Sequence, residues 1–367
     1  MLNIGVVGCG NISGIYFKNL TTLFGNVRVL ACADLDTEKA KKAAEEWKIE
    51  KILTVDDMLS CPEIDLVLNL TTPVAHYPIN KRCLEAGKSV YVEKPLALTY
   101  AEGKELVTLA QQKGLYLGCA PDTFMGAGVQ TSCKLIGDGM IGAPVAASAF
   151  MMCHGHEGWH PAPAFYYDIG GGPLFDMGPY YITALVRMLG RAVAVSAMTS
   201  RAYEERTIGS QPLFGQKMPV KVDTHISGLI RFESGAIATL VTSFDVWKHG
   251  MPCIEVYGTL GSLKVPDPNT FGGPVLCATS NDKEFREIPL INPYKENSRG
   301  IGVSDTALAM EEKRCNNASG ALGLHVLEIM EGLIRSGKEK REIAIESAPS
   351  PAIPLKRDCP KGMLCTE

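Results

Sequence analysis

Short apolar runs alternate with longer helical stretches along the first 118 residues. The runs that end at Val7 and Leu70 are apolar almost throughout, as expected for strands whose two faces are both covered by helices. This rhythm predicts βαβ units and a buried parallel sheet. The predicted strands span residues 2–7, 27–33, 65–70, 89–92 and 115–118, and the predicted helices span residues 12–23, 37–47, 75–86 and 99–113.

After residue 120 the pattern changes, and strands dominate from residue 193 onward. The segments 232–236 and 258–261 have the composition of hairpin connections, which predicts an antiparallel sheet. A second domain of α+β type follows from this pattern. Its predicted strands span residues 145–153, 193–199, 224–232, 236–244, 253–258 and 261–265, and its predicted helices span residues 128–136, 178–189 and 323–335.

A glycine-rich turn follows the first predicted strand. Gly8 permits a tight turn there, and Gly10 allows the backbone to approach a pyrophosphate. The amides from Asn11 and Ile12 onward, at the start of the next helix, offer N–H donors to that anion. The fingerprint is imperfect because Ser13 occupies the position of its usual third glycine.

Asp34 ends the second predicted strand, where an acidic side chain accepts hydrogen bonds from the adenosine ribose hydroxyls of a dinucleotide. A carboxylate at this place repels the 2′-phosphate of NADP, and Leu35 offers no group to hold that phosphate. The other interpretation is that Asp34 caps the helix starting near Thr37, but Asp36 fits that cap better. We therefore expect NAD in preference to NADP.

Composition narrows the class of partner. The length of 367 residues favours two domains, and 46% hydrophobic and 21% charged residues exclude a disordered chain. The net charge of −4 gives no positive field for nucleic acid or anionic lipid, and no apolar run approaches the roughly 20 residues of a membrane span. The 12 cysteines are scattered without a Cys-x-x-Cys pair, and the start of the chain lacks a basic segment, which favours reduced thiols and a cytoplasmic location.

Two further turns follow predicted strands. Thr71, Thr72, Pro73 and His76 come after the strand that ends at Leu70, and the segment 93–95 reads Glu-Lys-Pro. Ligands of doubly wound sheets bind beyond the carboxyl ends of the strands, so both turns are expected to face the cofactor.

Together with the glycine-rich turn, Asp34 and the segment 170–178 (Gly-Gly-Gly-Pro-Leu-Phe-Asp-Met-Gly), these motifs resemble the glucose-fructose oxidoreductase, inositol dehydrogenase and rhizopine catabolism (Gfo/Idh/MocA) family. The resemblance covers roughly the whole chain. It implies an α/β fold with an NAD-binding, doubly wound Rossmann domain at residues 1–120. An α+β domain for substrate binding and oligomerisation is implied at 121–346, with an open-faced, mainly antiparallel sheet, and a proline-containing tail at 347–367.

The resemblance also implies an oxidoreductase that passes a hydride between NAD and a secondary hydroxyl or carbonyl of a sugar or polyol bound between the domains. The family residues that match Glu93 and Lys94 lie at the nicotinamide ribose and at the reacting substrate. Lys94 is flanked by apolar Val92 and Pro95, so we expect its pKa to be lowered there. Lys94 would then hold or relay the hydroxyl proton.

The second-domain motif departs from the family pattern. That pattern is Asp-x-Gly-x-His, whereas Asp176 is followed by Tyr180 at the histidine position. A phenol, whose pKa is ordinarily about 10, is a poor base at neutral pH unless a cation stabilises the phenolate. Three interpretations follow: Tyr180 forms a relay with Lys94 while Asp176 binds a substrate hydroxyl, His160 replaces the missing imidazole, or Tyr180 is a packed helical aromatic.

The segment 154–160 contains three histidines and Glu157, which is a composition that can bind a metal. Hydride transfer to nicotinamide needs no metal, so we expect none here. Trp159 and His160 are candidate substrate contacts in this segment. Asp122, near the domain junction, is either a ligand for a substrate hydroxyl or a turn former.

We therefore expect a cytoplasmic, homo-oligomeric, NAD-dependent dehydrogenase of a sugar, glycoside or polyol, with the C3 hydroxyl of a glycoside as one position of oxidation. Two alternatives stay open. One is an NAD-dependent enzyme that cleaves glycosides through a transient oxidation, and the other is a sensor that binds NAD without turnover.

Overall fold

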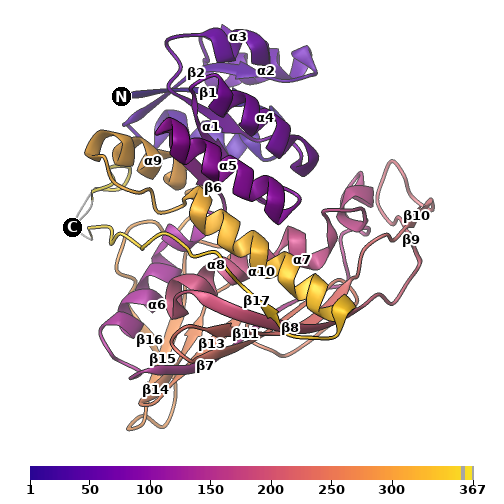
Figure 1. Ribbon diagram of the computed structural model, residues 1–367, viewed down its shortest axis with the longest axis vertical. Helices are drawn as coiled ribbons and strands as arrows, with labels where there is room; N and C mark the ends of the chain where they lie inside the picture. The colour runs from indigo at the N-terminus through magenta and orange to yellow at the C-terminus, as the bar shows by residue number, and fades with distance from the viewer. Residues whose placement is uncertain (357–359, 366–367) are drawn as a thin grey trace. The chain divides into compact units, whose positions relative to one another are not determined.

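The computed structural model describes residues 1–356 and 360–365, which belong to two compact units (Figure 1). Unit 1 comprises Met1–Ala127, Ile291–Leu327 and Pro349–Glu367, and unit 2 comprises Gly128–Leu290 and Glu328–Ala348. The domains expected from the sequence are contiguous in the chain, whereas each unit gathers segments that are distant in the chain. Part of the predicted tail, residues 357–359 and 366–367, lies outside the described residues.

Unit 1 contains a six-stranded parallel sheet with the strand order β3-β2-β1-β4-β5-β6. All residues of β4 and β5 are buried, which explains why their sequences are mostly apolar. The order reverses between β1 and β4, which is the place where doubly wound sheets bind nucleotides. The predicted Rossmann fold is confirmed. The strands are β1 (Leu2–Val7), β2 (Val27–Ala33), β3 (Lys51–Ile52), β4 (Leu66–Asn69), β5 (Ser89–Val92) and β6 (Leu117–Cys119).

The helices of unit 1 begin and end at residues that suit those places. The Asp36 carboxylate accepts a hydrogen bond from the N–H of Glu38 at the start of α2, as expected for a cap. Thr99 and Glu102 form a capping box at the start of α5, and Gly114 ends that helix in the left-handed conformation. The helices are α1 (Ser13–Thr22), α2 (Thr37–Trp47), α3 (Val55–Ser60), α4 (Pro73–Glu85), α5 (Tyr100–Lys113), the 3₁₀ turn η1 (Thr123–Met125) and α9 (Ile301–Glu312).

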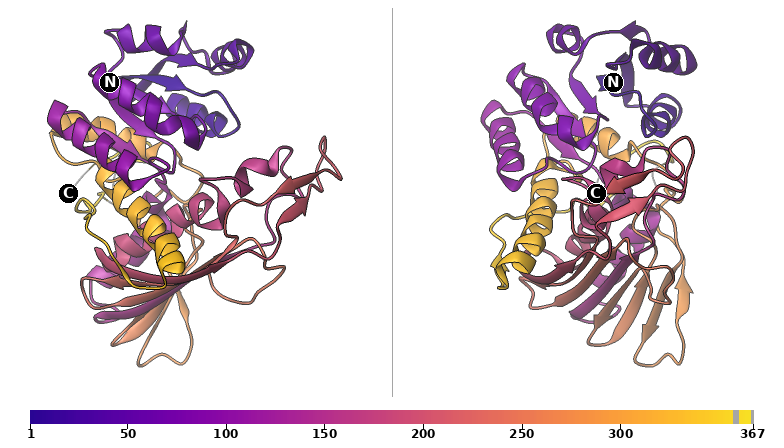
Figure 2. Two further views of the ribbon diagram at one scale, coloured as in Figure 1. Left: turned by 45° about the vertical axis from the view of Figure 1, so that its right-hand side comes forward. Right: turned by 90° about the vertical axis from the view of Figure 1, so that its right-hand side faces the viewer.

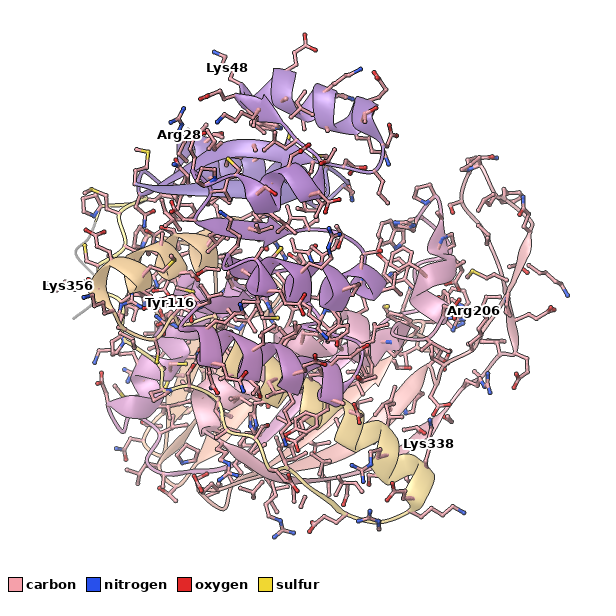
Figure 3. All side chains as sticks on the ribbon, turned by 45° about the horizontal axis from the view of Figure 1, so that its top comes forward. Arg28, Lys48, Tyr116, Arg206, Lys338 and Lys356 are labelled. Carbon is pink, nitrogen blue, oxygen red and sulfur yellow. The ribbon has the colours of Figure 1, made fainter. Side chains whose placement is uncertain are left out.

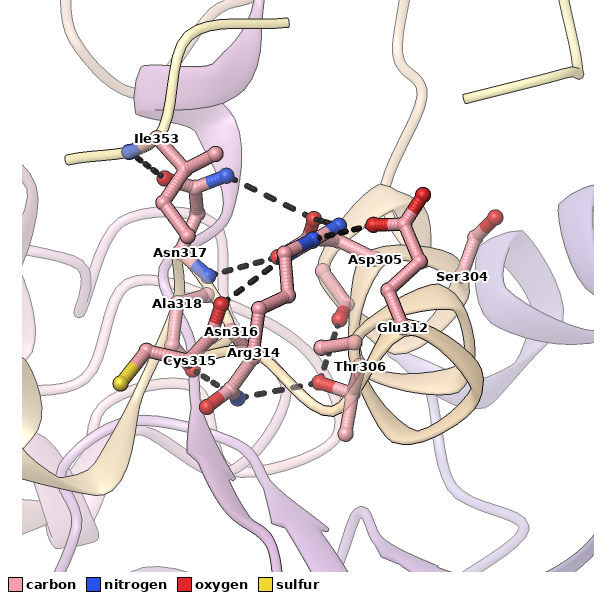
Figure 4. A network of polar contacts seen from close by, with 12 residues as sticks. Ser304, Asp305, Thr306, Glu312, Arg314, Cys315, Asn316, Asn317, Ala318 and Ile353 are labelled. Carbon is pink, nitrogen blue, oxygen red and sulfur yellow. Dashed lines mark hydrogen bonds and ion pairs between the residues drawn. The ribbon is translucent and has the colours of Figure 1, made fainter. Parts of the chain in front are cut away.

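A polar network joins α9 to the segment that follows it (Figure 4). Asp305 is buried, which raises its pKa, and it accepts hydrogen bonds from the Arg314 guanidinium at 2.8 Å and from the N–H of Asn317. The Asn317 side chain in turn accepts a hydrogen bond from the N–H of Ile353 at 2.8 Å. The irregular tail is therefore attached to unit 1 by a buried ionic network.

Unit 2 contains a nine-stranded sheet with the order β16-β15-β14-β13-β7-β12-β11-β8-β17 and a separate hairpin of β9 and β10. The sheet is mainly antiparallel, as predicted, although β7 and β12 run parallel to each other. The strands are β7 (Pro144–Met152), β8 (Ala192–Ser200), β9 (Glu205–Thr207), β10 (Lys217–Pro219), β11 (His225–Phe232), β12 (Ile237–Ser243), β13 (Ile254–Gly258), β14 (Gly261–Val265), β15 (Val275–Thr279), β16 (Arg286–Ile288) and β17 (Ile343–Ala344). The remaining helices are α6 (Ala127–Gly137), η2 (Pro163–Tyr167), α7 (Gly172–Asp176), α8 (Gly178–Leu189) and α10 (Gly320–Glu339), which contributes residues to both units.

One face of the nine-stranded sheet is covered and the other is open (Figures 1 and 2). A Cβ added at Gly228 of β11 would lie 2.6 Å from Leu333, so α10 packs closely on this strand. On the other face, where no helix of the described residues lies, Met198, Leu229 and Ile237 are 82%, 48% and 41% exposed. The predicted open-faced sheet is present.

Ten cysteines between Cys9 and Cys315 are free thiols, in line with the scattered pattern in the sequence. Cys365 is disulfide-bonded, which departs from that expectation. Within residues 1–356 and 360–365, none of the helices combines the length and the apolarity needed to cross a membrane.

Asp122 lies under the N-terminus of α9 and not at an open surface. One carboxylate oxygen accepts hydrogen bonds from the N–H groups of Gly300 and Gly302 at 2.9 and 3.0 Å. Burial raises the pKa of Asp122 from 3.8 to about 6, although these hydrogen bonds and Arg299 oppose the shift. The structure thus gives Asp122 a structural role in place of the predicted contact with substrate.

This burial predicts a pH-dependent stability. Between pH 3.8 and about 6 the folded chain binds more protons at Asp122 than the unfolded chain does, so the free energy of unfolding should fall as the pH rises. Asp122→Asn keeps an acceptor but cannot ionise, and should reduce this fall by up to about 3 kcal/mol. Urea unfolding at pH 4 and pH 7 measures the difference. Parallel pH profiles for the two proteins would contradict the assigned environment of Asp122.

Candidate active site

The glycine-rich turn connects β1 to α1. Gly8 has a φ of 99°, and a Cβ added there would lie 2.8 Å from the carbonyl group of Leu70, so this position requires glycine. A Cβ added at Gly10 would meet no atom within 4 Å, so packing within the chain does not require a glycine there. Helix α1 begins after Ile12 without a side-chain cap or an acidic residue in its first turn. Its N-terminal amides are thus arranged to receive an anion.

Asp34 lies directly beside this turn, one residue after β2. Its carboxylate oxygens accept hydrogen bonds from the N–H of Cys9 at 2.7 Å and from the N–H of Asp36 at 2.8 Å. The glycine-rich turn, the uncapped helix and this carboxylate together have the chemistry that an adenine dinucleotide requires. The residues of unit 1 therefore fit NAD.

His76 joins the turns that follow β4 and β5. Its ring nitrogens face the carbonyl oxygens of Pro95 at 2.7 Å and Thr71 at 3.0 Å. Burial lowers the pKa of His76, although these two carbonyls oppose that effect. The ring is fully buried, so the expectation that His76 itself faces the cofactor is corrected. Its role is to position two turns that are predicted to hold the cofactor.

Glu93 connects the end of β5 to α1. One of its oxygens accepts a hydrogen bond from the Tyr16 hydroxyl at 2.7 Å, and the other accepts one from the N–H of Lys94 at 3.0 Å. Burial and the adjacent carboxylate raise the pKa of Tyr16. Lys94 is half-buried and lies at the carboxyl end of the sheet. The predicted roles of Glu93 and Lys94 toward nicotinamide and substrate stay predictions.

In unit 2, Asp176 is the last residue of α7 and Tyr180 lies in the first turn of α8. The Asp176 carboxylate is 3.2 Å from Nε2 of His156, which comes from the loop after β7. Both side chains are mostly buried, with 17% and 14% exposed. Tyr180 is buried as well, at 7% exposure. An imidazole thus lies beside Asp176, but it comes from a distant segment, and the sequence places this histidine only in the segment 154–160 whose composition can bind a metal.

His160 has other partners. Its Nδ1 accepts a hydrogen bond from the N–H of Ala162 at 3.1 Å, and its ring packs edge-on against Phe165 and Tyr166. His154 stacks on Trp247 with ring centroids 3.3 Å apart. The three histidines of the segment 154–160 therefore have separate environments. Trp159 is 63% exposed next to His156, where its face is open to a ligand.

A buried guanidinium holds this loop in place. Arg206 of β9 (Figure 3) has 3% of its side chain exposed and forms ion pairs with Glu157 and Asp245. It also donates a hydrogen bond to the carbonyl oxygen of Phe244 at 2.7 Å, and the Tyr167 hydroxyl donates one to Glu157. No sequence motif indicates this cluster, because its charges come from three separate segments.

Two family models match the chain. An NAD-binding Rossmann fold of an oxidoreductase family matches residues 2–120, and the Gfo/Idh/MocA C-terminal domain matches residues 129–264. The chain belongs to the Gfo/Idh/MocA family. The resemblance inferred from the motifs is confirmed, and with it the oxidoreductase class and the NAD-binding domain.

Curated relatives in this family share about a quarter of their residues with the chain. A 1,5-anhydro-D-fructose reductase of Ensifer adhaerens is 28% identical over 267 residues, which cover 71% of this chain and 74% of the relative. An NADP-dependent scyllo-inositol 2-dehydrogenase of Bacillus subtilis (strain 168) is 22% identical, with 94% and 96% covered. A structure of levoglucosan dehydrogenase with NADH and L-sorbose has a TM-score of 0.82 at 23% identity, covers 95% of this chain and 99% of its own, and shares the fold.

The Arg206 cluster predicts a strong effect on stability. Arg206→Met leaves Glu157 and Asp245 buried without their counterion, and should lower the free energy of unfolding by about 3–5 kcal/mol. The matched control is Lys217→Met on the paired strand β10, because the ion pair of Lys217 with Glu205 is exposed. That change should cost less than about 1 kcal/mol. Urea unfolding measures both variants, and equal losses would refute the assigned role of Arg206.

Proposed function

We propose that the protein is an NAD-dependent oxidoreductase that transfers a hydride between nicotinamide and a secondary hydroxyl of a sugar, glycoside or polyol. The observation that carries this proposal is the position of Lys94. Glu93 and the half-buried Lys94 follow β5 at the carboxyl end of the parallel sheet, where the glycine-rich turn after β1 also lies. The relatives that act on 1,5-anhydro-D-fructose and scyllo-inositol support the substrate class.

We assign the binding of the cofactor to the turns of unit 1. The main chain at Gly8 and Gly10 and the first turn of α1 would hold the pyrophosphate, and Asp34 would accept hydrogen bonds from the adenosine ribose. When bound, NAD supplies an acceptor for the hydrogen that leaves the carbinol carbon with its electron pair. The other assigned residues are Asn11, Ile12, Thr71, Thr72, Pro73 and Glu93.

The substrate is assigned to Lys94 and to side chains of unit 2. Lys94 would hold the reacting oxygen through its ammonium group, and Asp176 would accept a hydrogen bond from a neighbouring hydroxyl. Tyr180 and His160 are further contacts in this proposal. The exposed face of Trp159 suits the C–H surface of a sugar ring or the aryl group of a glycoside, which favours a glycoside oxidised at C3 among the possible substrates.

We further propose that the protein forms homo-oligomers through the open face of the nine-stranded sheet. The support is the exposed apolar group of Met198, Leu229 and Ile237 on that face. The ten free thiols support a cytoplasmic location, where thiols stay reduced.

The choice of cofactor is tested at Asp34. Wild-type protein should bind NADH more tightly than NADPH, because the Asp34 carboxylate repels a 2′-phosphate. Asp34→Ala should weaken NADH binding by about 10- to 100-fold, which corresponds to one lost charged hydrogen bond, and should narrow the difference between the two nucleotides. Fluorescence titration measures both dissociation constants, and Glu38→Ala, an exposed change in α2, is the control. Equal binding of both nucleotides by the wild type would rule out this preference.

The reaction is tested by mixing the protein and NAD with hexoses, inositols and aryl glycosides and following the absorbance of NADH. Lys94→Ala should lower kcat by about 100-fold or more while the affinity for NADH changes little. Lys104→Ala, on the exposed side of α5, is the control.

Absence of NADH formation from every alcohol, together with absence of NADH oxidation by every ketone, would contradict the proposed reaction. Cleavage of a glycoside without net formation of NADH would support the alternative enzyme, which cleaves glycosides through a transient oxidation. Binding of NADH without turnover of any substrate would support the alternative that the protein is a sensor.

A further inference from the structure

We propose that His156, oriented by Asp176, exchanges the proton of the reacting hydroxyl. This inference rests on the proposed oxidoreductase function and adds a residue that the sequence motif does not contain. The family motif places a histidine one helical turn after the aspartate, and here that position is Tyr180. The structure supplies the imidazole from the loop after β7.

The contact with Asp176 determines which nitrogen of His156 can act as a base. A carboxylate only accepts hydrogen bonds, so the Nε2 that faces Asp176 at 3.2 Å carries the proton of the neutral ring. Nδ1 then keeps its lone pair. Among residues 1–356 and 360–365, the structure gives His156 Nδ1 no hydrogen-bond partner, and the side chain remains 14% exposed. A general base needs a free lone pair and must be accessible to the hydroxyl that it deprotonates.

The backbone of His156 is held from both sides. Its N–H donates a hydrogen bond to the Tyr167 hydroxyl at 3.3 Å, and its carbonyl accepts one from the N–H of His160 at 2.9 Å. The adjacent Glu157 is tied to the buried Arg206. The loop therefore presents His156 in one fixed position.

The ring of His156 is held by aromatic neighbours. Tyr166, Phe244 and Trp159 have ring centroids 4.4, 4.7 and 5.3 Å from the imidazole. Such packing fixes the orientation of a catalytic side chain and excludes most water from it. The partly exposed Trp159 leaves one side of this cluster open.

The two rivals for this role are less suited to it. Tyr180 is a phenol and is 7% exposed, so it requires a cation before it accepts a proton at neutral pH. The Nδ1 of His160 already accepts the N–H of Ala162. His156 combines an imidazole, a carboxylate partner and an unpaired ring nitrogen.

The proposed step is balanced. In the oxidation, the carbinol C–H bond breaks and its electron pair leaves with the hydrogen toward NAD, while the O–H bond breaks and its proton goes to Nδ1 of His156. The carbinol becomes a carbonyl group. The imidazolium that forms faces the Asp176 carboxylate, which stabilises the positive charge. In the reduction, Nδ1 returns the proton to the oxygen.

The first test is His156→Gln in the full-length protein. It should lower kcat by about 10²- to 10⁴-fold, the usual contribution of a general base, while the dissociation constant for NADH stays within about threefold of the wild type. His249→Gln, a change in an exposed histidine of the same unit, is the matched control and should keep wild-type kcat. A second variant, His156→Ala, should recover activity with added imidazole, which a purely structural role would not produce.

A second readout needs neither cofactor nor turnover. In ¹⁵N-histidine NMR spectra of the cofactor-free protein, the signals of His156 are identified as those that are missing in His156→Gln. In the wild type these signals should show a proton on Nε2 and no proton on Nδ1. A proton on Nδ1 of the neutral ring would overturn the inference, because that nitrogen could not accept another.

The outcomes separate this inference from the proposed function. If the wild type turns over and His156→Gln does so equally well, only the inference fails. If no alcohol or ketone reacts with the wild type, the proposed function fails and the inference fails with it. Loss of activity in His156→Ala that imidazole never restores, with NADH binding also lost, would assign His156 a structural role and would overturn the inference.

Discussion

The buried guanidinium of Arg206 is the constraint on which the candidate site of unit 2 depends. A charge with so little exposure is tolerated only when it is paired, and Arg206 pairs with Glu157 and Asp245 from two other segments. These ion pairs join the loop after β7, the hairpin strand β9 and the segment that follows β12. Because Glu157 follows His156 directly, the same network sets the position of the imidazole beside Asp176.

In unit 1, buried contacts hold together the turns that are proposed to bind the cofactor. The turns after β1, β4 and β5 must lie close together if they are to hold one nucleotide. Gly8 allows its turn to approach Leu70, His76 connects Thr71 to Pro95, and Glu93 connects Lys94 to α1 through Tyr16. Buried contacts thus arrange the polar groups that remain available to a ligand.

The sequence was sufficient to predict those strands and turns whose structure depends on the local pattern of residues. Mostly apolar runs located β1, β2 and β5 to the residue, and turn motifs predicted a nucleotide site at the ends of these strands. Helix α9 escaped prediction because its buried residues are mainly small or polar and form no apolar stripe. The parallel pairing of β7 with β12 and the contact between His156 and Asp176 join distant segments, and nothing in the local sequence records either. The same holds for the buried partners of Asp122.

We expect the proton of the reacting hydroxyl to leave toward Nδ1 of His156, and the hydrogen on the carbinol carbon to leave with its electron pair toward NAD. The most direct test of this expectation is a crystal structure of the protein with NADH and an unreactive analogue of the substrate. The account predicts the oxygen that corresponds to the reacting hydroxyl within about 3 Å of Nδ1 of His156, with Nε2 still on Asp176. An oxygen held by Tyr180 or His160, with His156 turned away from the ligand, would contradict it.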